Sequence, residues 1–168
     1  GFCCAVIQLN DPTRSNAWGK EMSVDFTNAV RGCARCQTSV LAIALQGAGH
    51  HFCVGGNPHE ERQALPLRDA ACEFRLAFEG FEMIRALNLP LTCAVHGKLV
   101  GGGVAACMTT DYIVADSRAT FEHGNLVRGV CPLSMFSRTL PNAIGDLRAL
   151  RMYLGNDTVD ATTAQRWY

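Results

Sequence analysis

The sequence carries no net charge, because 15 Lys and Arg residues balance 15 Asp and Glu residues among 168 positions. The two signs are interspersed, which argues against a basic face for nucleic acid or a polybasic patch for a membrane surface. Long hydrophobic runs are also missing, and the longest apolar stretches are too short to cross a bilayer. No secretory signal is visible at the N-terminus. We therefore expect a cytoplasmic protein with no nucleic-acid partner and no membrane partner.

An initiator Met is missing as well, and the first residues, GFCC, resemble the middle of a strand. We therefore expect the core fragment of a longer chain. The length fits one domain, residues 1–168, with enough chain to bury a core. Repeats, linkers and low-complexity segments are absent.

A second cysteine pair at zinc spacing is also lacking. Only Cys33 and Cys36, of nine cysteines, form a CxxC pair, so we expect no metal site. The number is odd and most cysteines lie in apolar segments. This favours buried thiols in a reducing compartment.

Strand-like and helix-like segments alternate along the chain. Short apolar runs predict strands, and apolar residues at steps of three and four predict helices. The expected strands are 3–9, 40–45, 91–95, 112–115 and 119–121, and the expected helices are 20–36, 68–87, 102–109, 135–144, 147–154 and 160–168. This order predicts an α/β domain with a mainly parallel sheet.

Two glycine-bearing segments follow two of these strands. Residues 50–57 read HHFCVGGN, and residues 96–103 read HGKLVGGG. Glycine lets the backbone take unusual dihedrals and approach a ligand closely. Ligands of parallel sheets bind beyond the carboxyl ends of the strands, where both segments lie. Two such turns can aim two backbone N–H groups at one point, as in an oxyanion hole.

Five spaced segments resemble the crotonase (enoyl-CoA hydratase/isomerase) superfamily. They are LNDP with NAW in 9–18, FCVGGN in 52–57, VGGGVA in 100–105 followed by Asp111, the loop 121–132, and DATTA in 160–164. They are similar to the family's LNRPxxxNAL, FxAGAD, LGGGxE, FGxPE and SAxxA segments. The resemblance implies a crotonase-like ββα spiral core, apparently truncated at the C-terminus. Family members continue past Tyr168 with helices that complete the acyl pocket and pack the subunits, so we expect a homotrimer at full length.

The resemblance also implies the substrate, an acyl thioester on coenzyme A or on the phosphopantetheine of an acyl carrier protein, with no cofactor of the enzyme's own. The N–H groups of Val54 and Gly102 are expected to bind the thioester oxygen and stabilise an enolate. The resemblance places further substrate contacts at His51, Cys53, Gly55, Gly56 and Gly101.

Two positions depart from the family pattern. Ala105 and Asn125 stand where the hydratases have the two glutamates that activate water. Neither side chain transfers a proton near neutral pH. Standard hydration, and isomerisation by the loop glutamate, are therefore disfavoured. Glu122 and His123 are the candidate replacements, and His59, Glu60 and Glu61 could line the rim.

The run 121–133 looks most like the decarboxylases of polyketide β-branching. That resemblance implies loss of CO₂ from a 3-methylglutaconyl group, with His123 as proton donor, Arg128 on the departing carboxylate and Asn125 at the substrate. Two alternatives stay open. One is an enoyl-CoA hydratase or isomerase with a relocated base such as Glu122, and the other is a catalytically silent scaffold module.

Overall fold

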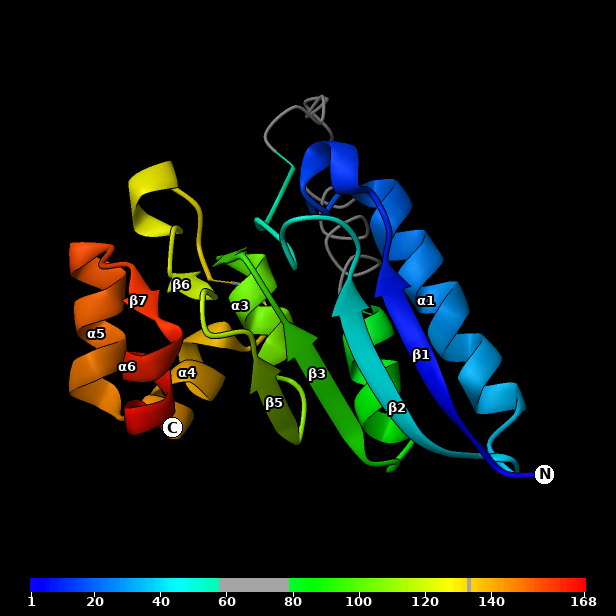
Figure 1. Ribbon diagram of the computed structural model, residues 1–168. Helices are drawn as coiled ribbons and strands as arrows, with labels where there is room; N and C mark the ends of the chain where they lie inside the picture. Colours follow the sequence, from blue (N-terminus) through cyan, green and yellow to red (C-terminus); the bar gives the residue numbers. More distant parts are fainter. Residues whose placement is uncertain (58–78, 133) are drawn as a thin grey trace.

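A four-stranded parallel sheet organises the domain, and its strand order is β1-β2-β3-β5. The computed structural model describes residues 1–57, 79–132 and 134–168. The strands run over Cys3–Leu9 (β1), Val40–Gly47 (β2), Leu91–Val95 (β3) and Tyr112–Ala115 (β5), as Figure 1 shows. The predicted parallel α/β architecture is confirmed.

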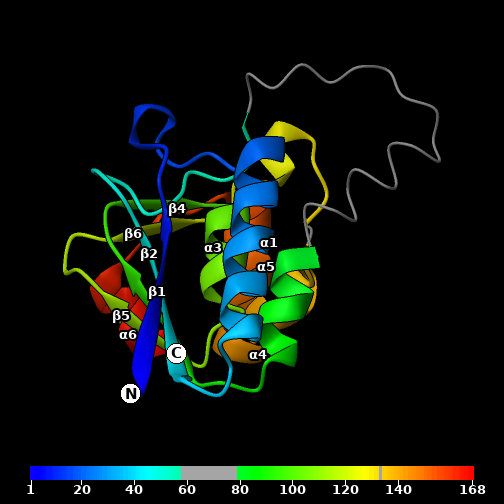
Figure 2. The ribbon, with the colours of Figure 1, turned by 90° about the vertical axis from the view of Figure 1, so that its right-hand side faces the viewer.

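Apolar side chains on one face of this sheet form the core with the helices. Ile43 and Leu45 of β2 are almost fully buried, as is Cys93, which pairs with Leu45 in the register. Helix α1 (Lys20–Arg35) contributes Phe26 and Val30 at a spacing of four, so both side chains face the sheet. Figure 2 shows α1 and α3 (Gly102–Cys107) on the same side of β1 and β2.

A second, smaller sheet was not expected from the sequence. It joins β4 (Lys98–Val100), β6 (Thr120–Glu122) and β7 (Val159–Asp160) in the order β4-β6-β7. The prediction treated 96–103 as a single turn, and that was wrong because β4 lies inside it. A strand of three residues is too short to show a periodicity. It forms because β6 supplies a parallel partner, with Leu99 opposite Phe121.

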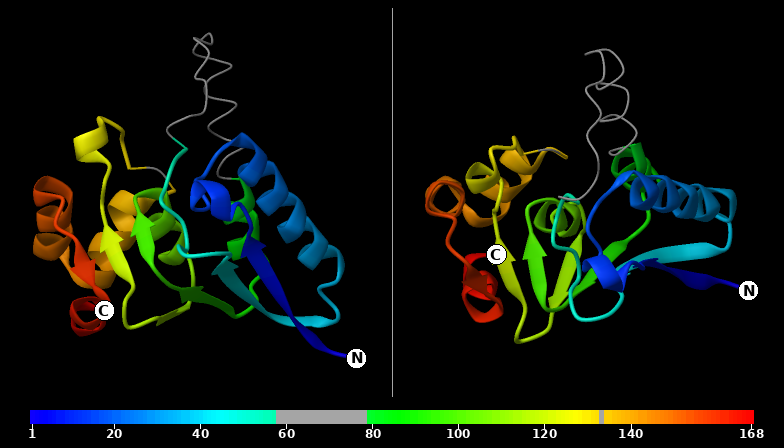
Figure 3. Two further views of the ribbon diagram at one scale, coloured as in Figure 1. Left: turned by 45° about the horizontal axis from the view of Figure 1, so that its top comes forward. Right: turned by 90° about the horizontal axis from the view of Figure 1, so that it is seen from above.

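The helices of the C-terminal part lie at the end of the molecule opposite α1 (Figures 1 and 3). They run over Phe136–Ile144 (α4), Asp146–Gly155 (α5) and Ala161–Trp167 (α6), close to the predicted ranges. Part of the predicted helix 68–87 lies outside the described residues. Its described part is helical over 79–86 and buries Phe81 and Ile84 in the core. Short 3-10 helices cover Pro12–Arg14 and Leu126–Arg128.

One buried amide ties the turn after β1 to the first glycine segment. Asn16 is fully buried, and its Nδ2 donates to the carbonyl oxygens of Ala48 (2.8 Å), His51 (2.8 Å) and Phe52 (3.1 Å). Its Oδ1 accepts the N–H of Asp11 at 2.8 Å. Because buried polar groups need partners, the buried Asn16 amide is satisfied by these four backbone groups. The residue therefore fixes where residues 48–52 lie.

Replacing this amide should destabilise the whole domain. Asn16→Ala is expected to lower the free energy of unfolding by about 3 kcal/mol, because each buried group that loses its partner costs roughly 1–3 kcal/mol. The measurement is urea denaturation followed by circular dichroism. Asn28→Ala is the matched control, since Asn28 is exposed and accepts only one bond, from Arg31. An unchanged midpoint in Asn16→Ala would contradict the role assigned to this side chain.

Candidate functional site

In the first glycine turn, one backbone N–H points away from the bridge that this turn forms with Trp18. The N–H of Trp18 donates to Gly55 O at 2.6 Å, and the N–H of Asn57 donates to Trp18 O at 2.9 Å. The C=O of Gly55 and the N–H of Gly56 belong to one trans peptide group, so they point in opposite directions. The N–H of Gly56, which lies between these two bonded groups, therefore points away from Trp18. Gly56 is exposed, and its N–H donates to no acceptor among the described residues.

The second glycine turn places a helix N-terminus beside the first. Gly101 has a φ of +49°, which few residues other than glycine adopt, and its N–H donates to Glu122 O at 3.0 Å. Helix α3 begins directly after it. The N–H of Gly102 belongs to the first turn of this helix and so has no acceptor within it. Gly102 is exposed, like Gly56.

The two turns are in direct backbone contact. A Cβ on Gly102 would lie 3.7 Å from Gly55 Cα and 3.9 Å from Gly56 N. A Cβ on Gly55, which has a φ of +88°, would lie 2.6 Å from Val100 O and 3.5 Å from Gly102 N. The free N–H groups of Gly56 and Gly102 are therefore neighbours on one exposed patch. This is the arrangement that two donors need to bind one oxygen.

The prediction that Val54 supplies one of these donors is corrected by the structure. The N–H of Val54 donates to Ser15 O at 3.2 Å and is not available to a ligand. The hydrogen-bonding partner comes from a segment about forty residues earlier in the chain. The spacing of the glycines alone did not reveal it. The N–H of Gly56, two residues further along the chain, has no such partner among the described residues.

The other predicted contacts of the first turn divide into buried and accessible groups. Cys53 is fully buried, so the expected substrate contact is wrong, and burial raises the pKa of its thiol to about 12. Gly55 and Gly101 are also buried, and their positive φ angles give the two turns their shape. His51 is partly exposed, and its Nδ1 accepts the N–H of Lys98 at 3.2 Å. That bond joins the first glycine segment to β4.

The positions of the missing glutamates carry no titratable group. Ala105 is buried in α3, with 3% of its surface exposed. Asn125 is 8% exposed, and its Nδ2 donates to Cys131 O at 3.1 Å. Its Oδ1 has no hydrogen-bond partner among the described residues and would lie 3.3 Å from a Cβ on Gly101. This buried oxygen therefore lies beside the second glycine turn.

Glu122 and Arg128, predicted as separate catalytic and binding groups, form an ion pair with each other. Arg128 Nη1 lies 3.3 Å from Glu122 Oε1 and donates to Gly124 O at 2.8 Å. Glu122 Oε1 also accepts from Asn156 Nδ2 at 3.0 Å. These bonds hold the loop after β6. They engage Oε1 of Glu122 and Nη1 of Arg128, while the Arg128 side chain stays 54% exposed.

His123, the predicted proton donor, is packed among aromatic rings. Its ring centroid lies 4.6 Å from that of Phe136 in α4 and 4.8 Å from that of Tyr153 in α5. The residue is 3% exposed, and its Nδ1 has no hydrogen-bond partner among the described residues. Desolvation lowers the pKa of His123, so the imidazole is neutral at pH 7 and a weak acid. His59, Glu60 and Glu61, the remaining candidates, lie outside the described residues.

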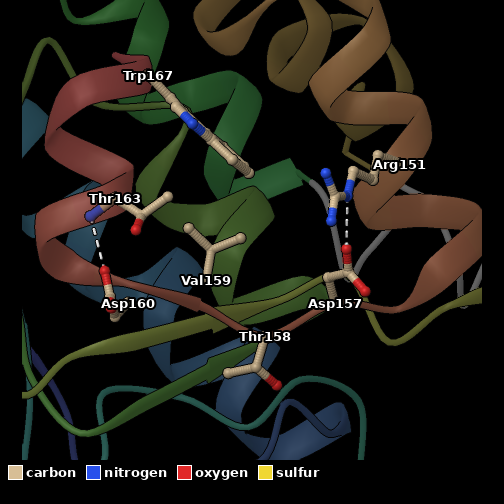
Figure 4. A pocket seen from close by; sticks show the side chains of 7 residues that line it. All are labelled: Arg151, Asp157, Thr158, Val159, Asp160, Thr163 and Trp167. Carbon is tan, nitrogen blue, oxygen red and sulfur yellow. Dashed lines mark hydrogen bonds and ion pairs between the residues drawn. The ribbon is translucent and has the colours of Figure 1, made fainter.

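Two cavities lie away from the glycine turns. One, of about 380 Å³, is shown in Figure 4, where Arg151 and Asp157 pair at 2.9 Å and Asp160 caps α6 by accepting the N–H of Thr163 at 2.7 Å. The other, of about 490 Å³, is mainly apolar and lies between α3, β5, α4 and α6. Within the described part of the chain, no His, Cys, Asp or Glu cluster is arranged to hold a metal ion. No helix in that part is long and apolar enough to span a membrane.

The contact between the turns predicts that substitution of two adjacent glycines changes the stability by different amounts. A Cβ on Gly103 would overlap the carbonyl oxygen of Cys53, whereas one on Gly102 meets only ordinary contacts. Gly103→Ala is therefore expected to lower the unfolding free energy by about 2 kcal/mol. Gly102→Ala should change it by less than about 1 kcal/mol. Chemical denaturation of both variants checks the pair. Equal stability of the two would show that the backbones do not touch as described.

Known proteins resemble this chain over nearly its whole length. The family model described as enoyl-CoA hydratase/isomerase matches residues 3–167. The probable enoyl-CoA hydratase echA12 of Mycobacterium leprae is 30% identical over 173 residues, which cover 96% of this chain and 57% of the relative. The probable enoyl-CoA hydratase EchA14 of Mycobacterium tuberculosis is 31% identical over 172 residues, with 96% and 62% covered.

Solved structures agree with these relatives. A probable enoyl-CoA hydratase/isomerase from Mycobacterium abscessus has a TM-score of 0.84 and 29% identity, with 96% of this chain and 62% of that one covered. A monofunctional enoyl-CoA isomerase from M. smegmatis has a TM-score of 0.76 and 28% identity, with 96% and 68% covered. The chain spans about three fifths of the length of the curated relatives it matches. With a matching family model and a shared crotonase fold, the chain belongs to the enoyl-CoA hydratase/isomerase family.

Proposed function

We propose that this chain carries the oxyanion hole of an enzyme that acts on acyl thioesters of coenzyme A. The N–H groups of Gly56 and Gly102 bind the thioester carbonyl oxygen and stabilise the enolate that forms from it. One observation carries this proposal: two exposed N–H groups, with no acceptor among the described residues, lie side by side where two glycine turns touch. The hydratases and isomerases among the relatives support the same reaction class.

The geometry stabilises negative charge that develops on the carbonyl oxygen during the reaction. Removing a proton next to the thioester carbonyl places negative charge on its oxygen. The two donors are already fixed by their turns, so they need no reorganisation when that charge appears. The N-terminus of α3 adds the positive end of a helix dipole beside Gly102. A single donor in such a site contributes about 3 kcal/mol to transition-state stabilisation.

Proton transfer needs a group other than those at the usual positions. Ala105 has no polar atom, the Asn125 amide does not titrate, and Glu122 is held by Arg128 and Asn156. Glu60 and Glu61 follow the first glycine turn in the sequence and are the carboxylates to test as bases. A hydratase or isomerase with a base supplied from this segment is our first proposal.

Decarboxylation is the second proposal, and the missing carboxylates at 105 and 125 favour it. Loss of CO₂ from a 3-methylglutaconyl thioester, on coenzyme A or on an acyl carrier protein, gives a dienolate without any base. The oxyanion hole then holds the dienolate until one acid protonates it. Arg128 pairs with Glu122 through Nη1, so a departing carboxylate would compete with Glu122 for this guanidinium. Decarboxylation therefore ranks below hydration and isomerisation.

Mass spectrometry with the full natural chain separates these reactions. Crotonyl-CoA that gains the mass of water supports a hydratase. A 3-enoyl-CoA that changes its chromatographic position at constant mass supports an isomerase. Loss of CO₂ from 3-methylglutaconyl thioester supports the decarboxylase. A folded protein that turns over none of them contradicts the enzymatic proposals and favours a silent scaffold.

Two substitutions at one residue isolate the proposed donor. Gly102→Pro removes the N–H, and proline is tolerated at the first position of a helix. It is expected to lower kcat by about 10²- to 10³-fold. Gly102→Ala keeps the N–H and should retain most of the activity. Steady-state kinetics on the accepted thioester provides the comparison, with circular dichroism as the control for folding. Equal kcat values in the two variants would remove Gly102 from the oxyanion hole.

A further inference from the structure

Two cysteines at the end of α1 lie outside the site and take no part in its chemistry. Cys33 is buried in the last turn of the helix, and Cys36 is the exposed residue that caps it. The N–H of Cys36 donates to Cys33 O at 3.1 Å and to Gly32 O at 3.3 Å. The helical hydrogen-bond pattern thus continues to Cys36. The two cysteines are therefore an i, i+3 pair on one side of the helix end.

The spacing of this pair suits a disulfide. Residues three apart in an α-helix have Cα atoms about 5 Å from each other, from the rise and radius of the helix. This lies within the range of roughly 4.4–6.8 Å that disulfides span. The described cysteines are all free.

A third thiol lies close by on β1. The N–H of Cys3 donates to Ser39 O at 2.9 Å, and the N–H of Ser39 donates to Cys36 O at 2.8 Å. Cys3 is exposed, as is Cys36. Burial, and then the neighbouring thiols of Cys36 and Cys3, raise the pKa of Cys33. Cys33 is therefore poorly suited to start an exchange, and the exposed Cys36 is open to an external reagent.

We propose that Cys36 and Cys33 form a dithiol modification site, in which Cys36 reacts with a low-molecular-weight disulfide such as oxidised glutathione and Cys33 then closes an intramolecular disulfide. In the first step the Cys36 thiolate attacks one sulfur of glutathione disulfide and releases one glutathione thiolate. In the second, the Cys33 thiolate attacks the Cys36 sulfur of the mixed disulfide and releases the second glutathione. One dithiol and one glutathione disulfide thus give one protein disulfide and two glutathiones.

The two cysteines lie at the opposite end of β2 from the first glycine segment. Cys36 precedes the start of β2, whereas the first glycine segment follows its end. Closing the disulfide is therefore expected to leave turnover of the thioester unchanged. This independence also separates a failure of the dithiol proposal from a failure of the proposed function.

The test is mass spectrometry of the full natural chain after incubation with oxidised glutathione. In the wild-type protein the peptide with Cys33 and Cys36 is expected to lose two hydrogens, which joins the two sulfurs, whatever glutathione is found on the exposed Cys3, Cys4 and Cys131. Cys33→Ser should stop at one glutathione on Cys36, because the resolving thiol is gone. Cys36→Ser should leave Cys33 reduced. Circular dichroism of both variants confirms the fold.

Two further variants make the outcome decisive. Cys3→Ser should still form the disulfide, and its failure to do so would overturn the pairing in favour of Cys3 with Cys36. Cys131→Ser is the matched control, since Cys131 is exposed but far along the chain from this pair, and it should behave as the wild type. Stable glutathione on Cys36 of the wild-type protein, without release of a second glutathione, would also overturn the proposal.

Discussion

The contact between two backbones at the glycine turns is the constraint on which the rest of the site depends. Val100 N donates to Cys53 O at 3.1 Å, and α3 begins two residues after Val100. A side chain at Gly55 or Gly103 would overlap the opposite backbone. The helix therefore starts close to the first turn only because both positions lack a Cβ. Asn16 fixes one side of this contact, and pairing of β4 with β6 fixes the other.

A site built from the main chain retains its electrostatic function when side chains change. The N–H groups of Gly56 and Gly102 belong to the main chain, and their positions depend on the path of the backbone that Asn16 helps to hold. Substitution of a glutamate by Ala105 or Asn125 removes a proton-transfer group but leaves both donors in place. Stabilisation of an enolate and transfer of its proton are therefore separable here. This separation explains how a chain with the family's fold can lack the family's carboxylates.

The sequence predicted the parts of the fold that depend on local patterns. Strands β1 and β3 and helix α4 follow from apolar runs or periodicity, and their predicted limits agree with the structure to within a residue. Strand β4 could not be predicted, because three residues form a strand only when a distant partner is present. The prediction of Val54 as the donor was wrong for the same reason, since the hydrogen bond from Val54 to Ser15 depends on tertiary structure. Glycine spacing located the site but left the choice of N–H open.

The polar residues at the end of β6 and in the loop after it show why residue type is a weak guide to catalysis. Glu122 and His123 are acid–base residues and Arg128 is an anion-binding residue, yet each is engaged by its local packing. The Glu122–Arg128 pair, with Asn156, ties the loop to the end of α5, and the His123 ring lies against Phe136 and Tyr153. Asn125 is held separately, because its Nδ2 donates to Cys131 O and its carbonyl oxygen accepts the N–H groups of Arg128 and Val130. With Glu122 bound by Arg128 and Asn156 and the His123 ring buried, the proton-transfer group is to be sought in other segments.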